Sequence, residues 1–141
     1  MFLLAGGVLS AFLASDRRIE ERQHARLLAV QDVPLTPFQS DGCSGGLSRV
    51  WNSLPDLLQV DPLPFEACCV THDRAYHSGG GQATARGSYM ARVAADRAFH
   101  GCVAQEGGSA LAEGLYQAVR LGGQPCSGLS WRWGYGRPAC R

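Results

Sequence analysis

Two adjacent cysteines, Cys68 and Cys69, lie in the segment with the clearest helical pattern, and they constrain the fold more than any other feature. Neighbouring positions on a helix point about 100° apart, so the two thiols face different parts of their surroundings. The chain of 141 residues contains 6 cysteines. Zinc-binding cysteines usually recur two to four residues apart, and this spacing does not occur here. We therefore predict a small domain with a helix cross-linked on two sides, and three disulfides in one of 15 pairings.

Three segments have the apolar periodicity of helices. They cover residues 65–77, 84–103 and 110–121, and glycine-rich runs separate them. Alternating apolar and polar residues never persist for more than a few positions, so we predict an all-α fold. Hydrophobic residues make up 45% of the chain, which excludes a disordered polypeptide. The net charge of +1 excludes the polybasic surface of a nucleic-acid-binding protein.

The N-terminal region divides into two segments of different character. Residues 1–14 are nearly all apolar but too few to span a bilayer of about 30 Å. Their length suits the apolar part of a signal peptide, and the alternatives are a buried helix or a misassigned start. Residues 16–30 are expected to be a solvated helix or a pro-segment, ended by Pro34 and Pro37. We predict a signal or apolar segment over 1–15, a helical segment over 16–34 and the functional domain over 35–141.

The helix over 65–77 carries five chemically active side chains on one broad face. Cys68, His72 and Tyr76 lie four residues apart, and Cys69 and Asp73 have the same spacing. An ordinary helix with a hydrogen-bonded histidine and a surface aspartate is the alternative explanation. It accounts for any one of these residues more readily than for all five within nine positions.

His72 gains a carboxylate partner if Cys68 is linked to Cys102 on the next helix. In an antiparallel pair with that bridge, position 98 lies opposite His72, and Asp96 is about 3 Å of helical rise away. A carboxylate on one ring nitrogen fixes the tautomer and leaves the other nitrogen to take a proton from water. This is the histidine–aspartate half of a hydrolytic triad, with water in place of serine.

A divalent cation would complete such a site. Asp73 is not the partner of His72 in this alignment, and a carboxylate beside a glycine-rich loop suits Ca²⁺, which binds carboxylate and carbonyl oxygens. That loop is residues 41–46, with the sequence Asp-Gly-Cys-Ser-Gly-Gly. A bridge from Cys43 to Cys69 would hold it one helical turn from Asp73. The ion would polarise an ester carbonyl and hold a phosphate.

The motif at residues 68–76, Cys-Cys-Val-Thr-His-Asp-Arg-Ala-Tyr, resembles the active-site signature of secretory phospholipase A2, in the form found in bacteria and fungi. Residues 96–102 resemble the second signature helix of that family, and residues 41–43 resemble its metal loop. The resemblance covers about residues 38–122. It implies that His72 is the general base that activates water, that Asp96 orients His72, and that Tyr76 hydrogen-bonds Asp96.

The same resemblance implies the ligands of a calcium ion. Asp73 would be the bidentate carboxylate ligand, and Gly42 would give a backbone carbonyl. Asp41 would add a side-chain oxygen to this loop site, and Ser44 would add a backbone N–H for the oxyanion.

The implied fold has two antiparallel disulfide-linked helices, a calcium-binding loop and a third, C-terminal helix. The implied disulfides are Cys43–Cys69 and Cys68–Cys102, and Cys126–Cys140 is the pair that remains. We expect the aromatic segment 131–135 to pack over this last closure, with a position at a lipid interface as the alternative.

The implied activity is calcium-dependent hydrolysis of the sn-2 ester of glycerophospholipids. We expect a secreted or otherwise extracytoplasmic monomer that acts on the surface of a phospholipid membrane or micelle. Two alternatives stay open. One is a catalytically silent module of the same fold that binds a membrane or a receptor. The other is a zinc hydrolase that uses His72, His77 and cysteine thiolates as ligands.

Overall fold

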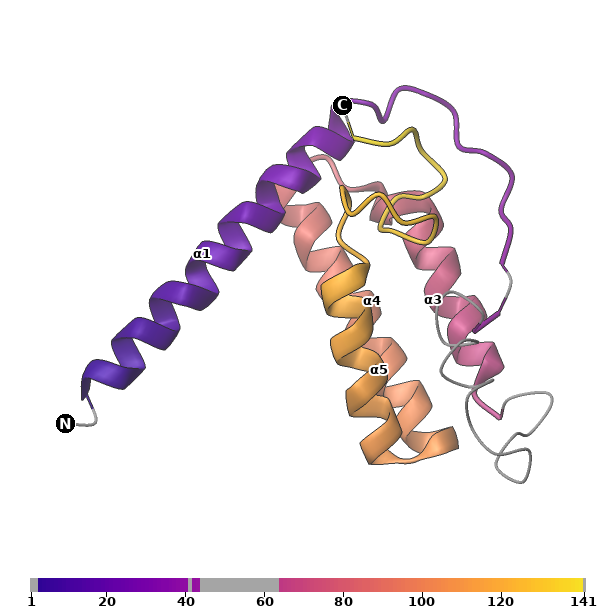
Figure 1. The fold of residues 1–141 in the computed structure, drawn as a ribbon. Coiled ribbons are helices and arrows are strands. Elements are labelled where there is room, and N and C mark those ends of the chain that lie inside the picture. Colours follow the sequence, from indigo (N-terminus) through magenta and orange to yellow (C-terminus); the bar gives the residue numbers. More distant parts are fainter. Residues whose placement is uncertain (1–2, 41, 44–63, 141) are drawn as a thin grey trace.

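Every regular element in the described part of the chain is a helix. The structure is a computed structural model that describes residues 3–40, 42–43 and 64–140, with side chains from residue 16 onward. Its elements are α1 (Leu3–Leu28), α3 (Glu66–Ser78), the short 3₁₀ helix η2 (Gly79–Gly81), α4 (Ala85–Gly107) and α5 (Ser109–Gly122). Figure 1 shows α3, α4 and α5 running roughly alongside one another, with α1 leaning against one end of this group. The predicted all-α fold is confirmed for these residues.

Helix α3, which carries the sequence motif, ends at a glycine that can adopt the left-handed conformation found at helix ends. Gly79 takes a left-handed conformation, with φ of 70°, and its N–H bonds the carbonyl of Tyr76. Gly80 follows with φ of 78°, a region that disfavours side chains, so the chain turns sharply out of α3. Thr84 then begins α4, because its hydroxyl accepts a hydrogen bond from the Gly87 N–H at 3.0 Å.

The main core lies among α3, α4 and α5. Its apolar side chains follow helical spacing, and Val103 of α4 and Ala112 of α5 are completely buried. The other members of this cluster are Cys43, Phe65, Cys68, Cys69, Phe99 and Leu115. The core therefore includes both cysteines of the α3 motif, and it fixes the face that α3 turns toward α4.

The predicted disulfides are all present. The structure links Cys43 to Cys69, Cys68 to Cys102 and Cys126 to Cys140. The first bridge ties the segment before residue 44 to α3, the second joins α3 to α4, and the third closes the C-terminal segment. All six cysteines are bonded, so the structure does not support the zinc site with thiolate ligands.

The N-terminal helix differs from the expectation for residues 16–30. We expected a solvated helix, but Glu20, His24 and Leu27 are buried. These residues are spaced by four and three positions, so they share one face of α1. That face packs against α4 and the C-terminal segment, whereas Arg18, Arg22 and Arg26 of α1 are exposed. The helix also runs without interruption through the predicted boundary at residue 15, and its first half extends away from the other helices (Figure 1).

The C-terminal segment folds back onto the end of α3. The N–H of Gly134 bonds the Tyr76 carbonyl at 2.6 Å, and the N–H of Gly136 bonds the His77 carbonyl at 3.0 Å. Trp133 is only 1% exposed and packs against Tyr76, with ring centroids 5.1 Å apart. Trp133 is thus in the interior, against Tyr76, while the packing of segment 131–135 over the Cys126–Cys140 closure stays a prediction.

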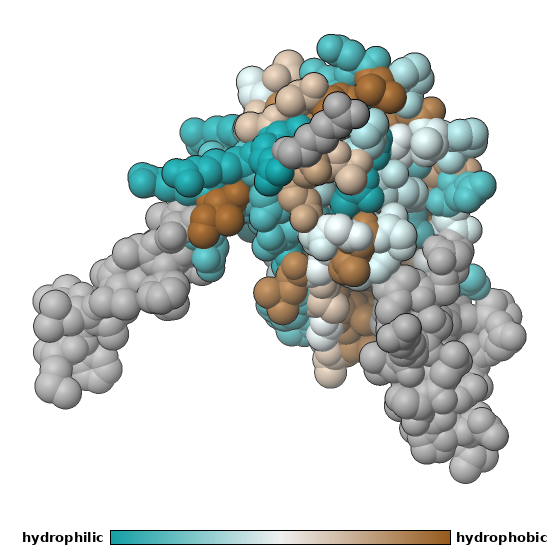
Figure 2. Space-filling view, turned by 45° about the horizontal axis from the view of Figure 1, so that its top comes forward, coloured by the Kyte–Doolittle hydropathy of each residue, from teal (hydrophilic) through white to brown (hydrophobic). Residues whose placement is uncertain are grey.

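The surface is mixed in character. Figure 2 shows apolar residues in several separate patches among polar ones on the face that it presents. Among the described residues, no helix is both long enough and apolar enough to cross a membrane.

Candidate functional site

The candidate site lies between α3 and α4, where the predicted contact is present. His72 Nε2 is 2.8 Å from Asp96 Oδ1, and both side chains are buried. The Cys68–Cys102 bridge lies one helical turn from His72, so it fixes the alignment of the two helices at this level. The expected hydrogen bond between the ring and the carboxylate is therefore confirmed, while the catalytic roles of the two residues stay a prediction.

Tyr76 belongs to the same cluster, as the resemblance implied. Its hydroxyl donates to Asp96 Oδ1 at 2.7 Å, and its ring packs against the His72 ring with centroids 4.2 Å apart. On α4, Phe99 contacts the His72 ring at a centroid distance of 4.6 Å. Burial is the main reason that the pKa of Tyr76 lies well above its ordinary value, so the phenol stays protonated and donates.

The surroundings of the Asp96 carboxylate determine its charge and the tautomer of His72. Burial alone would raise the pKa of Asp96, but the hydrogen bond from His72 and the positive charge of Arg92 outweigh it. Further hydrogen bonds from Arg120 and Tyr76 act in the same direction, so the Asp96 pKa lies below its ordinary value. An ionised carboxylate can only accept hydrogen bonds, so His72 Nε2 is the donor. In the neutral ring, Nδ1 is then the nitrogen that can accept a proton.

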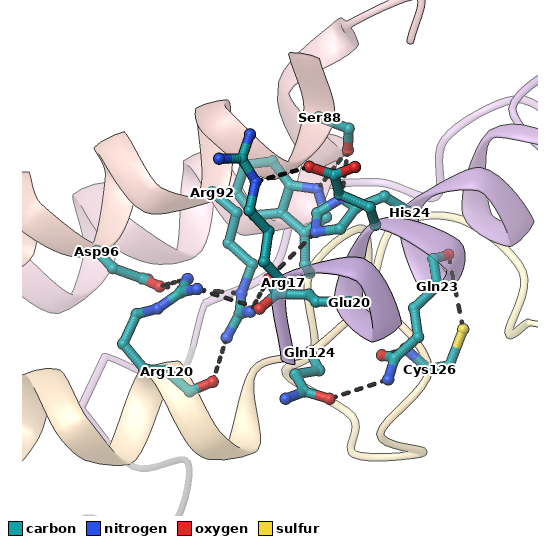
Figure 3. A network of polar contacts seen from close by, with 12 residues as sticks. Arg17, Glu20, Gln23, His24, Ser88, Arg92, Asp96, Arg120, Gln124 and Cys126 are labelled. Carbon is teal, nitrogen blue, oxygen red and sulfur yellow. Dashed lines mark hydrogen bonds and ion pairs between the residues drawn. The ribbon is translucent and has the colours of Figure 1, made fainter. Parts of the chain in front are cut away.

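A network of buried ion pairs lies behind Asp96, and Figure 3 shows it from close by. Arg120 Nη1 donates to Asp96 Oδ2 at 2.7 Å, and Arg120 Nη2 donates to Glu20 Oε2 at 3.1 Å. Arg92, completely buried, donates to Glu20 Oε1 and to the Tyr76 hydroxyl. Two carboxylates and two guanidinium groups thus balance in the interior, as buried charges must.

A second branch of this network leads away from Asp96. His24 Nε2 lies 3.3 Å from Glu20, and His24 Nδ1 lies 2.7 Å from the hydroxyl of Ser88 on α4. The indole N–H of Trp133 donates to the same hydroxyl at 3.0 Å. This branch connects α1, α4 and the C-terminal segment without contacting Asp96.

Sequence reasoning missed this network. The four-residue spacings of Glu20 with His24, and of Arg92 with Asp96, are a signal that each pair shares a helix face. That spacing is common on solvated helices too, so it does not reveal burial. Arg120 carries no local signal, because its partners lie 24 and 100 residues away in the chain.

The candidate calcium ligands are only partly within the described residues. The hydroxyl of Ser40 donates to Asp73 Oδ2 at 2.7 Å, and the Gly42 N–H donates to the Ser40 hydroxyl at 3.1 Å. Gly42 has φ of 67°, which suits a tight turn. The start of the predicted loop therefore lies beside Asp73, while Asp41 and Ser44 are outside the described residues.

Oxygen donors of this kind suit a hard cation such as Ca²⁺. In the ranges that the structure describes, no cluster of three or more His, Cys, Asp or Glu side chains could hold a metal. A calcium site at Asp73 would thus draw on backbone carbonyls and on the rest of the loop. Ser40 was not predicted, and its position three residues before Cys43 carries no signal for this contact.

A groove of about 820 Å³ opens beside Asp73. Its apolar walls come from Val70 of α3, from the segment before the loop and from the C-terminal segment. The lining residues are Phe38, Gln39, Ser40, Val70, Asp73, Ser130, Trp131 and Tyr135. A groove lined by three aromatic side chains, a valine, three polar side chains and a single carboxylate suits a ligand that has both apolar and polar parts.

Comparisons with models of protein families, with curated proteins and with solved structures found no match to this chain.

Proposed function

We propose that this chain is a secreted, calcium-dependent phospholipase A2 that releases the sn-2 fatty acid from glycerophospholipids. The observation that carries the proposal is the 2.8 Å contact between His72 Nε2 and Asp96 Oδ1. It coincides with a sequence motif that places Asp73 directly after His72 and Tyr76 one turn later. A buried dyad beside a second carboxylate is what activation of water next to a metal requires.

In the proposed reaction, His72 takes a proton from water at Nδ1. The water oxygen attacks the ester carbonyl carbon, and His72 then returns the proton to the departing alkoxide oxygen of the lysophospholipid. Asp96 keeps Nε2 protonated throughout and stabilises the imidazolium, while Tyr76 holds the carboxylate from one side. Water is the nucleophile, so no acyl-enzyme forms.

The proposed calcium ion is a cofactor for which this chain supplies oxygen ligands. When bound, it would polarise the ester carbonyl and neutralise the phosphate. Asp73 would supply the carboxylate, Gly42 a backbone carbonyl and Asp41 a side-chain oxygen. Ser44 in the same loop would supply a backbone N–H for the oxyanion. Ser40 holds the Asp73 carboxylate at Oδ2, and the Cys43–Cys69 bridge ties the loop to α3.

The groove beside Asp73 supports a lipid as the substrate. Its aromatic and aliphatic walls would accept an acyl chain, and a cation lies at its edge. The guanidinium of Arg74 is 4.2 Å from the centre of the Phe38 ring, and Phe38 lines the groove. An exposed arginine held by an aromatic ring is well suited to a phosphate group. The three disulfides are typical of proteins that fold in an oxidising compartment, which favours secretion.

Release of fatty acid from vesicles tests the proposal. Phosphatidylcholine vesicles are prepared with a labelled chain at the sn-2 position or, in a matched set, at the sn-1 position. We expect calcium-dependent release of the sn-2 label alone, and no release in EGTA. Binding to vesicles without release would indicate the silent membrane-binding module instead. Release of both labels at equal rates would contradict the assigned position of attack.

A further inference from the structure

Asp96 is held at both carboxylate oxygens, and the two sides differ in origin. Oδ1 receives the hydrogen bonds from His72 and Tyr76, which the sequence motif accounts for. Oδ2 receives the hydrogen bond from Arg120, which lies in the last turn of α5. Arg120 is in turn held by Glu20 of α1. A chain of contacts thus runs from α1 through α5 and α4 to His72 on α3.

We propose that Arg120 and Glu20 are positioning residues, which hold the Asp96 carboxylate in the orientation that bonds His72 Nε2. The proposal rests on the proposed function for its catalytic part. Its structural part concerns the hydrogen bond between His72 and Asp96 and can be tested separately. The proposal gives the C-terminal half of α1 a role in positioning the His72–Asp96 pair.

The geometry explains why a second support is needed. A carboxylate held at one oxygen alone can rotate about its Cβ–Cγ bond, and the direction of the Oδ1 lone pairs then changes. The Arg120 hydrogen bond at 2.7 Å anchors the other oxygen and restricts this rotation. Charge-assisted bonds of this kind are shorter and stronger than neutral ones, so they hold direction as well as distance.

Glu20 holds Arg120 in place. Without it, the guanidinium of Arg120 could turn its Nη1 away from Asp96 toward solvent, because its side chain is still 17% exposed. The Glu20 Oε2 contact at 3.1 Å fixes the second nitrogen of the same planar group. Arg92 adds a backbone anchor, since its Nη2 donates to the carbonyls of Val119 and Arg120 at 2.7 and 2.8 Å. The last turn of α5 is thereby fixed to α4.

The charge balance supports the same assignment. The ionisable groups around Asp96 are Glu20 and His24 from α1, His72 and Tyr76 from α3, Arg92 from α4 and Arg120 from α5. The two carboxylates, Glu20 and Asp96, pair with the two guanidinium groups, Arg92 and Arg120. Removing Arg120 takes a charge-assisted hydrogen bond directly from Asp96 Oδ2, and removing Glu20 takes the partner that holds Arg120.

The second branch of the network supplies a matched control. Ser88 is completely buried and joins His24 of α1 to Trp133, so its loss also weakens the attachment of α1 to α4. It does not contact Asp96. A network that only stabilises the fold predicts equal effects from the two branches, whereas positioning predicts an effect from the Arg120 branch alone.

The experiment follows the imidazole N–H proton that His72 donates to Asp96. A proton in a bond to a buried carboxylate gives a strongly downfield NMR resonance, assigned here by its loss in His72→Gln. The variants are Arg120→Met, Arg120→Lys, Glu20→Gln and Ser88→Ala, with kcat and KM measured on phosphatidylcholine vesicles. Arg120→Lys and Glu20→Gln keep the test valid if Arg120→Met does not fold.

We expect Arg120→Met and Glu20→Gln to shift or broaden the resonance and to lower kcat by about 10- to 100-fold at unchanged KM. Arg120→Lys should recover part of both, because it keeps the charge but has a single donor nitrogen in place of two, and Ser88→Ala should change neither. The proposal is overturned if Arg120→Met leaves the resonance unmoved, or if Ser88→Ala alters it equally. If the wild-type protein releases no fatty acid, the proposed function fails, and the resonance alone decides the positioning role.

Discussion

Replacing Arg92 by methionine will destabilise the protein strongly, because this one buried side chain donates hydrogen bonds to four acceptors. Arg92 donates to Glu20, to the Tyr76 hydroxyl, and to the carbonyls of Val119 and Arg120. Methionine has a similar length and fills much of the space, but it donates nothing. Breaking a buried ion pair by removing one partner costs about 3–5 kcal/mol, and each buried acceptor left unpaired about 1–3 kcal/mol.

These costs do not simply add, since Glu20 keeps its bonds to Arg120 and His24. We therefore expect Arg92→Met to lower the free energy of unfolding by about 4 kcal/mol. At about 2–4 °C per kcal/mol, the midpoint of thermal unfolding falls by about 8–16 °C.

Chemical denaturation followed by circular dichroism measures this loss, with the disulfides kept intact. The matched control is Arg97→Met, on the same helix but exposed, where a change within about 0.5 kcal/mol is expected. A loss below about 1 kcal/mol for Arg92→Met would refute the reasoning, because it would mean that the buried acceptors find other partners.

Three further predictions concern pH, the third disulfide and calcium. Burial lowers the pKa of His24 below its ordinary value of 6.5, so the unfolded chain binds a proton there before the folded protein does. Thermal stability should thus fall as the pH drops below 6.5, and His24→Gln should flatten this part of the pH profile. Replacing Cys126 and Cys140 by serine should reduce stability by about 3 kcal/mol, since the bridge closes a segment of about 15 residues, and differential scanning calorimetry of the oxidised proteins measures it. Asp73→Asn should raise the calcium concentration for half-maximal fatty-acid release about tenfold or more, with the circular dichroism spectrum unchanged; an unaltered calcium dependence would remove Asp73 from the ligand set.

The contact between His72 and Asp96 was predictable because helices are regular. Once one disulfide aligns two antiparallel helices, the rise per residue determines which side chains face one another. Cys68 and Cys102 supplied that alignment. The end of α3 at Gly79 and the start of α4 after Thr84 followed from local signals that act within a few residues.

The role of α1 was not predictable, because it depends on groups that are distant in the chain. A helix rich in arginine and glutamate usually faces solvent, and nothing in the sequence around Glu20 distinguishes it from such a helix. Its burial is possible only because Arg92 and Arg120 balance the Glu20 charge. Burial alone would raise the pKa of Glu20, but the hydrogen bond with His24 and the charges of both arginines hold it below the ordinary value. No local pattern encodes such a balance.

The most direct test of the central claim compares two histidine variants in the sn-2 release assay with saturating calcium. His72 contacts Asp96 in the interior, whereas His100 lies on the following helix and pairs with Glu113 at the surface, at 3.2 Å. We predict that His72→Gln lowers kcat at least about 100-fold, the contribution expected of a general base, and that His100→Gln leaves it unchanged. Equal rates of release by the wild-type protein and His72→Gln would contradict the account.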